Sequence, residues 1–398
     1  MKRVRDLVIE MPKSPLPAGA AVKGGSYPFF VSGPSPLRID QALAHNQAVI
    51  LSTGGNAAVH YCTEHYSYST DAWALQPIES KIDGRFLYYF LLSQIERIAV
   101  LGFQGSGLKH LRKDFVRDYL VPSVERIEQS KIAEILTTVD RAIEQTETLI
   151  AKQQRIKTGL MHDLLTRGID EHGNLRSEST HEFKDSPLGR IPVEWQCDVG
   201  ARFFDLRAGI PVSRLMRSQD GNALFLKVDD FNDPANANGL IRSEYTFVCT
   251  PILESRLLQP GTIVFPKRGA AIFVNRVELL KRTGTLDPNL MGLIPKARVR
   301  PEFMRLVLLH RNLGTICDNS GIPQINNKHL YPLLFMMPGY EEQREIVTRV
   351  MKSEGLLFAS TESVQKLQRL RTGMMQDLLT GNRRVTALLK PSPEEGDS

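Results

Sequence analysis

Two segments of this chain, 214 positions apart, carry nearly the same sequence. Residues 154–166 read QRIKTGLMHDLLT and residues 368–380 read QRLRTGMMQDLLT, and nine of the thirteen positions are identical. At the same offset, Glu128 and Gln129 match Glu342 and Gln343. An internal repeat constrains the architecture more than any single motif does, because each copy must form the same kind of unit.

Apolar residues recur through both copies at spacings typical of one face of a long helix. A helix from about residue 126 to 165 would be roughly 60 Å long at ~1.5 Å per residue. Its stripe needs a partner, and two near-equal stripes can bury each other as a coiled coil. Two unrelated amphipathic helices in similar domains are the alternative. The residues predicted for the coiled coil or for subunit contact are Ile132, Leu136, Ile143, Ile150, Ile156, Leu160, Leu164, Ile346, Val350, Leu357, Val364, Leu370, Met374 and Leu378.

Composition sets wide limits on the class of protein. A chain of 398 residues is long enough for two or more domains. The net charge of +6 permits a nucleic-acid partner without demanding one. The four cysteines form no CxxC pair, which is typical of reduced thiols in a cytosolic protein. The N-terminal apolar run is too short for a signal peptide, and no stretch approaches ~18 apolar residues, so no membrane span is expected.

Each predicted helix follows a region rich in glycine, proline and short apolar runs, which indicates short strands and turns. The fold class expected is α/β, with two mixed modules separated by two long helices in a pseudo-twofold repeat. A polar, turn-prone stretch between the copies indicates a linker, and the end of the chain is expected to be disordered. The predicted boundaries are a first module over 1–124, a helix over 125–168, a linker over 169–190, a second module over 191–338, a helix over 339–381 and a tail over 382–398.

Polar and basic residues occupy corresponding loops of the two modules. Cations there can contact phosphates or a guanine edge, and glycine lets the backbone approach a phosphate closely. A segment from Lys109 to Lys113 precedes the last predicted strand of the first module, as Asn326 to His329 does in the second. A solvated basic surface is the alternative for any one residue. The predicted DNA-binding residues are Thr53, Gly54, Gly55, Asn56, Lys109, His110, Arg112, Lys113, Lys267, Arg268, Arg276, Asn326, Asn327 and Lys328.

Motifs for other chemistry are weak. GFQGSG (102–107) contains the FxGxG pattern of S-adenosylmethionine methyltransferases, but it lacks the expected preceding acidic residue, and no NPPY-like tetrapeptide occurs. Three potential zinc ligands, His60, Cys62 and His65, have no second cluster to complete four ligands. Glu182 and Lys184 form an ExK pattern outside any strand context, and STGGN (52–56) lacks the lysine of a P-loop. We therefore predict no catalytic residue, metal or cofactor.

The order of module, helix, module and helix resembles the specificity subunit of type I restriction–modification systems. The matching segments are the two Glu-Gln pairs, TGLMHDLLTRG and TGMMQDLLTG at the helix ends, and PLGRIPVEW (187–195) at the start of the second module. Further matches are GSYPFFVSG (25–33), STGGNAAVHY (52–61), YSTDAW (68–73), LQPGTIVFPKRG (258–269) and INNKHLYPL (325–333). One departure is that Pro122 lies seven residues before Gln129, whereas Pro338 lies five before Gln343.

The resemblance implies a non-catalytic, cytoplasmic subunit with two target-recognition domains, each reading one half of a bipartite site on double-stranded DNA. The two helices would form an antiparallel coiled coil that sets the spacer, and would bind two methyltransferase subunits. Restriction subunits with endonuclease and translocase activity would join the complex. Two other functions stay open: a coiled-coil scaffold whose modules bind protein or carbohydrate, and a self-contained methyltransferase built around Phe103 to Gly107.

Overall fold

The computed structural model describes residues 1–211, 221–250, 254–318 and 321–389. The chain divides into two compact units, one formed by Met1–Leu149 with Ser360–Ser398 and the other by Ile150–Ala359. We call these unit 1 and unit 2 and describe each by itself. Among the helices of the described ranges, none has the length and hydropathy that crossing a membrane requires.

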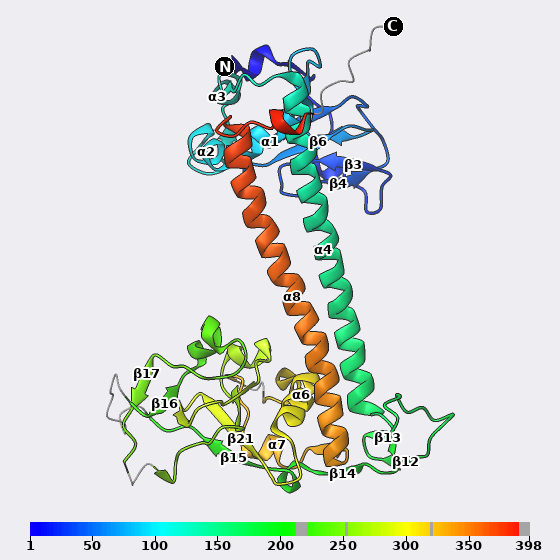
Figure 1. The fold of residues 1–398 in the computed structure, drawn as a ribbon, viewed down its shortest axis with the longest axis vertical. Helices are drawn as coiled ribbons and strands as arrows, with labels where there is room; N and C mark the ends of the chain where they lie inside the picture. Colours follow the sequence, from blue (N-terminus) through cyan, green and yellow to red (C-terminus); the bar gives the residue numbers. More distant parts are fainter. Residues whose placement is uncertain (212–220, 251–253, 319–320, 390–398) are drawn as a thin grey trace. The chain divides into compact units, whose positions relative to one another are not determined.

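Two long helices contribute to both units (Figure 1): α4 (Arg126–Thr166) has 41 residues and α8 (Tyr340–Leu379) has 40. In unit 1, Arg371 of α8 pairs with Asp140 of α4 at 2.6 Å. In unit 2, Lys157 of α4 pairs with Glu354 of α8 at 2.8 Å. From Asp140 to Lys157 is 17 residues forward along α4, and from Arg371 to Glu354 is 17 residues back along α8. Both ion pairs therefore fit the same antiparallel register.

The predicted stripe is largely buried, with one correction. Seven of its residues are buried, namely Ile132, Leu136, Leu164, Ile346, Val350, Val364 and Leu378, and Ile143, Ile150, Leu160, Leu357 and Met374 are half-buried. In contrast, Ile156 and Leu370 are 55% and 49% exposed and lie outside the stripe. Six residues after Ile150 an α-helix has turned roughly 600°, which leaves Ile156 about 120° away from the stripe. Gln153 and the matching Leu367 are half-buried instead.

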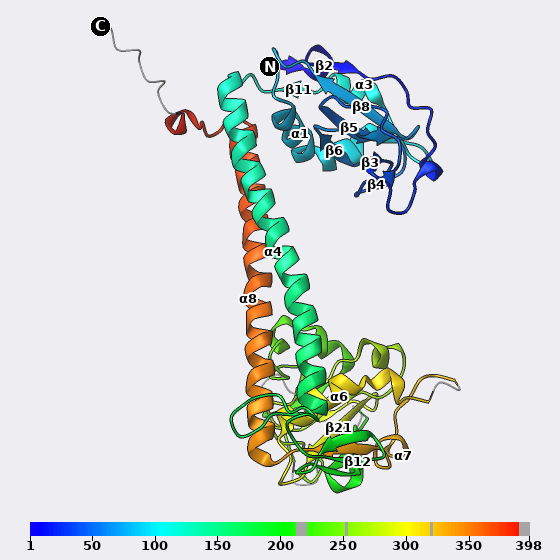
Figure 2. The same cartoon turned by 90° about the vertical axis from the view of Figure 1, so that its right-hand side faces the viewer.

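Unit 1 contains a four-stranded antiparallel sheet in the order β2-β8-β5-β6 and a three-stranded sheet in the order β4-β3-β7. Every residue of β5 is buried, and α1 (Gly84–Ser93) packs beside β5 and β6 (Figure 2). Asp83 caps α1 by accepting hydrogen bonds from the amides of Arg85 and Phe86. The strands are β2 (Val8–Glu10), β3 (Tyr27–Phe30), β4 (Leu37–Ile39), β5 (Ala48–Ser52), β6 (Val59–Cys62), β7 (Ser67–Tyr68) and β8 (Ala72–Pro77).

Unit 2 repeats this topology. Its sheets have the orders β15-β21-β18-β19 and β17-β16-β20. In the two sheets of each unit, one strand pair is parallel and the others are antiparallel. The parallel pair is β3 with β7 in unit 1 and β16 with β20 in unit 2. The strands are β15 (Phe204–Ala208), β16 (Ala223–Leu226), β17 (Tyr245–Phe247), β18 (Ile263–Pro266), β19 (Glu278–Leu279), β20 (Gly284–Leu286) and β21 (Leu290–Pro295), and α6 (Pro301–Arg311) follows β21 as α1 follows β8. The prediction of mixed α/β modules in an internal repeat is confirmed.

The segments after the two long helices are more ordered than the sequence suggested. In the predicted linker, β12 (Phe183–Ser186) and β13 (Gly189–Pro192) form a hairpin, and Ile169 and Arg176 are buried. In the predicted tail, Val385 is 4% exposed and Thr386–Leu388 form a 3-10 turn. The final segment PSPEEGDS, expected to be disordered, lies outside the described residues. The expected disorder of the tail is therefore wrong for residues 385–388, and both segments supply buried side chains.

Candidate nucleic-acid interface

In unit 1 the predicted DNA-binding residues form one surface from two loops. β9 (Phe103–Gln104) and β10 (His110–Leu111) make a hairpin in which His110 pairs with Gln104. The glycine loop after β5 is bound to this hairpin by two backbone hydrogen bonds, from the Gly55 amide to the Lys109 carbonyl at 3.0 Å and from the Leu111 amide to the Thr53 carbonyl at 2.9 Å. The residues from Thr53 to Asn56 and those from Lys109 to Lys113, distant in sequence, thus lie side by side.

Unit 2 builds the same frame with every partner shifted by 214 positions. The Gly269 amide donates to the Pro323 carbonyl at 2.8 Å, and the Ile325 amide donates to the Lys267 carbonyl at 2.8 Å. Asp318 pairs with Gln324, matching Gln104 with His110. The frame also corrects the alignment of the loops, since Gln324 corresponds to His110 and Asn326 to Arg112. Lys109 to Lys113 therefore match Pro323 to Asn327, not Asn326 to His329.

The predicted side chains differ in how far they face solvent. The exposed ones are Asn56, Lys109, His110, Arg112, Arg268, Asn327 and Lys328, and Thr53, Gly55, Lys113, Lys267, Arg276 and Asn326 are half-buried. Gly54 is buried and contributes only backbone. Asn326 caps α7 (Asn327–Leu330), which leaves less of its polarity for a ligand. The exposed set consists of lysine and arginine cations, asparagine amides and the His110 imidazole, which suits contact with phosphates and base edges.

Two of the three half-buried cations, Lys113 and Arg276, have contacts inside their own domain. The Lys113 ammonium lies 5.1 Å from the centre of the Trp73 ring, and burial lowers the pKa of Lys113. Burial, and then the charge of Arg268, lower the pKa of Lys267. The Arg276 guanidinium donates a hydrogen bond to the Phe231 carbonyl. That bond gives Arg276 a role within unit 2, so we rank it below Arg268 as a DNA contact.

The repeated Glu-Gln pair holds the start of each long helix. In unit 1 the Glu128 side chain is buried and its carboxylate accepts hydrogen bonds from Arg384 Nε at 2.8 Å and from the Val385 amide at 2.9 Å. The hydrogen bond from the Arg384 guanidinium lowers the pKa of Glu128. Burial acts in the opposite direction but is the smaller effect, so the pKa lies below its ordinary value. A residue at the start of α4 is thereby joined to the segment that follows α8.

Unit 2 contains the corresponding cluster with different partners. The Glu342 carboxylate accepts hydrogen bonds from Arg176 Nη1 at 2.6 Å, from the Ile169 amide at 2.9 Å and from the Trp195 indole at 3.1 Å. Trp195, the last residue of PLGRIPVEW, is fully buried. Gly168 has a φ of +64°, and a Cβ there would lie 2.2 Å from Glu342 Oε1, so only glycine fits this turn. We call these two clusters the Glu128 clamp and the Glu342 clamp.

The glutamines of the repeat attach each helix to its own module. Gln129 accepts from the Asp83 amide at 2.8 Å and donates to the Val124 carbonyl at 2.8 Å. Gln343 accepts from the Arg300 amide at 2.8 Å and donates to the Pro338 carbonyl at 3.0 Å. Both side chains are buried, so these bonds replace water. Sequence reasoning found the two glutamate–glutamine pairs but not their partners Arg384, Arg176 and Trp195.

The other motifs have ordinary surroundings in the structure. His60 Nε2 lies 3.0 Å from the Gly33 carbonyl oxygen, and the described residues contain no group of three or more metal-ligand side chains. The FxGxG segment forms a β-hairpin strand and its turn, whereas a cofactor-binding glycine turn leads from a strand into a helix. This geometry removes the structural basis for a cofactor site at Phe103 to Gly107.

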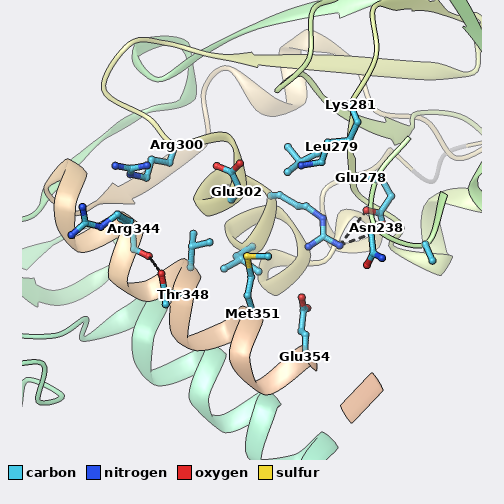
Figure 3. Close-up of a pocket in the computed structure, with 15 residues that line it drawn as sticks. Asn238, Glu278, Leu279, Lys281, Arg300, Glu302, Arg344, Thr348, Met351 and Glu354 are labelled. Carbon is cyan, nitrogen blue, oxygen red and sulfur yellow. Dashed lines mark hydrogen bonds and ion pairs between the residues drawn. The ribbon is translucent and has the colours of Figure 1, made fainter. Parts of the chain in front are cut away.

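A cavity of about 450 Å³ in unit 2 lies between α6, α8 and the loop before Leu240 (Figure 3). Charges of both signs line it, and Arg305 pairs with Glu278 at 3.2 Å. Burial raises the pKa of Glu278, opposed by the charge of Arg305. Glu354 pairs with Lys157 of α4 at 2.8 Å, so the carboxylates of Glu278 and Glu354 already have cationic partners.

Comparisons with known proteins match this architecture. Residues 2–153 match the type I restriction modification DNA specificity domain. The chain is 24% identical over 387 residues to the type I restriction enzyme EcoDI specificity subunit of Escherichia coli, which covers 90% of this chain and 81% of that protein. It is 22% identical over 355 residues to the type I restriction enzyme MjaVIII specificity subunit of Methanocaldococcus jannaschii, with 86% and 80% covered.

Solved structures share the fold. The S subunit of a type I restriction–modification system from M. genitalium superposes with a TM-score of 0.62 at 18% identity, over 95% of each chain. A structure from a study of complex assembly and conformational transition of the type I R-M system gives a TM-score of 0.56 at 15% identity, over 96% of this chain and 97% of that one. By sequence and by fold, the chain is similar to the specificity subunits of type I restriction–modification systems, as its repeated motifs predicted.

Proposed function

We propose that this chain is the sequence-specific DNA-binding subunit of a type I restriction–modification complex, and that each unit reads one half of a bipartite target. The observation that carries the proposal is the loop frame repeated at an offset of 214. The same backbone hydrogen bonds present Asn56, His110 and Arg112 in unit 1 and Arg268, Gln324 and Asn327 in unit 2. The backbone of the loop frame is the same in both units, but the polar side chains on it differ. This is what we expect if the two units bind different base sequences.

The long helices set the spacer in this proposal. A helix of 41 residues is roughly 60 Å long at ~1.5 Å per residue, which exceeds one ~34–36 Å turn of DNA. The ion pairs of Asp140 with Arg371 and of Lys157 with Glu354 keep one register in both units. A change in helix length would then change the number of unread base pairs between the two half-sites.

Partner subunits would bind the same helices. Both helices leave large apolar side chains in solvent, and an exposed apolar surface on a helix commonly marks a protein interface. Along the middle of the helices these side chains include Leu149 and Ile156 on α4 and Met351, Leu356, Phe358 and Leu370 on α8. Ile156 and Leu370 match at the repeat offset, which suits two identical partners bound in equivalent positions. We assign these partners as two methyltransferase subunits, joined by restriction subunits, with this chain acting in the cytoplasm and contributing neither catalytic residues nor a cofactor.

Co-expression of the chain with the methyltransferase subunit of its host tests the proposal. We expect methylated adenines, mapped across the genome, to lie in one gapped motif that disappears when this chain is omitted. Replacing residues 191–337 with the second recognition domain of a different specificity subunit should change only one half of the motif. Methylation that is unchanged without the chain overturns the proposal, and a change in both halves overturns the independence of the two readers.

The competing function is a coiled-coil scaffold that binds protein or carbohydrate. It predicts negligible DNA affinity, whereas phosphate contacts require affinity to fall steeply as the salt concentration rises. Fluorescence anisotropy of the complex with a duplex carrying the mapped motif, at 50 and 200 mM salt, separates the two. No measurable binding at 50 mM salt favours the scaffold.

A further inference from the structure

Each loop frame carries an exposed aliphatic side chain at the same position. Ser106, Gly107 and Leu108 in the first hairpin recur as the sequence Ser-Gly-Ile, ending at Ile322, at the 214 offset. Leu108 is 67% exposed and Ile322 is 73% exposed. Leu108 lies between the paired residues Gln104 and His110, and Ile322 lies between the paired residues Asp318 and Gln324.

The backbone beside each aliphatic residue is held in place. In unit 1 the Leu108 carbonyl oxygen lies 2.7 Å from where a Cβ on Gly105 would stand, and Gly105 has a φ of +140°, so the hairpin turn requires glycine there. The next carbonyl, that of Lys109, accepts the Gly55 amide. In unit 2 the residue after Ile322 is Pro323, whose ring fixes φ and whose carbonyl accepts the Gly269 amide. Each aliphatic residue thus lies directly before a residue whose carbonyl is held by a hydrogen bond.

Burial within the fold does not explain these side chains. One exposed leucine is ordinary on a protein surface. Two at the same position of a repeated frame, in modules whose other loop residues differ apart from the shared Ser-Gly, indicate a common ligand feature. The exposed cations beside them are Lys109 in unit 1 and Arg268, which bridges to Gln324, in unit 2, so the ligand surface is anionic and also presents an apolar group. The C5 methyl group of thymine is the apolar group that the major groove of DNA offers.

We propose that Leu108 and Ile322 are specificity-determining residues, each contacting a thymine methyl group in the half-site that its own unit reads. This inference rests on the proposed function and adds to it a predicted base. The flanking cations bind the phosphates, and the aliphatic side chain then distinguishes thymine from cytosine, which has no methyl group at C5.

The test replaces thymine by deoxyuridine, one position at a time, in a duplex carrying the mapped motif. Binding by the complex of this chain with its methyltransferase subunits is measured by fluorescence anisotropy. We expect one replacement in each half-site to weaken binding about fourfold, the effect of removing one buried methyl group. Leu108→Ala should remove the sensitivity to deoxyuridine in one half-site only, and Ile322→Ala should remove it in the other half-site only.

Leu120→Ala is the matched control, because Leu120 is 50% exposed in unit 1 but lies outside the loop frame. It should leave every deoxyuridine effect unchanged. The inference is overturned if no thymine shows the effect, if both alanine variants keep it, or if Leu108→Ala weakens binding of the methyltransferase subunit and leaves DNA sensitivity intact. In each of these cases a gapped methylation motif that depends on this chain still supports the proposed function, so the two failures are distinguishable.

Discussion

Replacing Glu342 by glutamine should destabilise unit 2 strongly, although the change keeps the size of the side chain. The Glu342 carboxylate accepts hydrogen bonds from Arg176, Trp195 and the Ile169 amide, and the Arg176 side chain is 9% exposed. Removing one partner of a buried ion pair costs about 3–5 kcal/mol, because the other charge stays buried without compensation. We expect the lower end of that range, about 3 kcal/mol, since glutamine still accepts one hydrogen bond and Glu194 lies 3.9 Å from Arg176.

The two tryptophans make this measurable, because Trp73 belongs to unit 1 and Trp195 to unit 2. In a Trp73→Phe background, the fluorescence of Trp195 follows unfolding of unit 2 in urea. A loss of about 3 kcal/mol corresponds to a melting temperature lowered by roughly 6–12 °C for a unit of this size. The control is Glu345→Gln, which removes an exposed carboxylate one turn further along α8. If Glu342→Gln loses no more stability than Glu345→Gln, the reasoning on the clamp is refuted.

Further predictions concern the other clamp, the cations and the helical pair. The pKa of Glu128 is lowered in the folded state, so its ionised carboxylate stabilises the fold fully above about pH 4.3, the ordinary pKa of glutamate. This stabilisation is lost as the pH falls through the folded-state pKa. In urea unfolding, the stability advantage of the unmodified chain over Glu128→Gln should therefore shrink only below about pH 4.3. Arg268→Ala should lower the slope of log affinity against log salt by about 1, whereas Arg276→Ala should lower stability and leave the slope unchanged. Glutamate at both Leu160 and Met374 should weaken the helical pair or partner binding, and an unchanged melting temperature with unchanged complex assembly would count against the spacer role of the helices.

The repeat made the long helices predictable, but the partners of the repeated glutamates were beyond sequence reasoning. Arg176 lies eight residues after Gly168, whereas Arg384 lies three residues after Gly381. The two arginines share no offset, so a search for repeats passes over them. Their segments are also polar and rich in turn residues, which favours the prediction of a linker and of a disordered tail. Burial comes only from tertiary contact with a helix start that is far away in sequence.

The loop frame was predictable in outline and wrong in register. Matching glycine loops placed Thr53 to Asn56 and Lys267 to Arg268 correctly in equivalent positions. The second loop was aligned by its place before the last predicted strand of each module, which set Asn326 against Lys109. Alignment by the aliphatic residue after Ser-Gly, Leu108 against Ile322, gives the register that the hydrogen bonds show. Backbone pairing follows the position of turns, and charge at a solvent-exposed position contributes little to it.

The residues that hold the long helices in place are different from the loop residues that vary between the two units. Glu342 and Gln343 bind α8 to the segment after α4 and to their own module, and Glu128 and Gln129 do the same for α4 and the segment after α8. None of the loop-frame side chains that we assign to DNA contact takes part in these bonds. Substitutions in the loops can therefore change which bases are contacted without altering the attachment of either helix. Substitutions in the clamps should alter stability and assembly in the same way whatever DNA sequence the loops select.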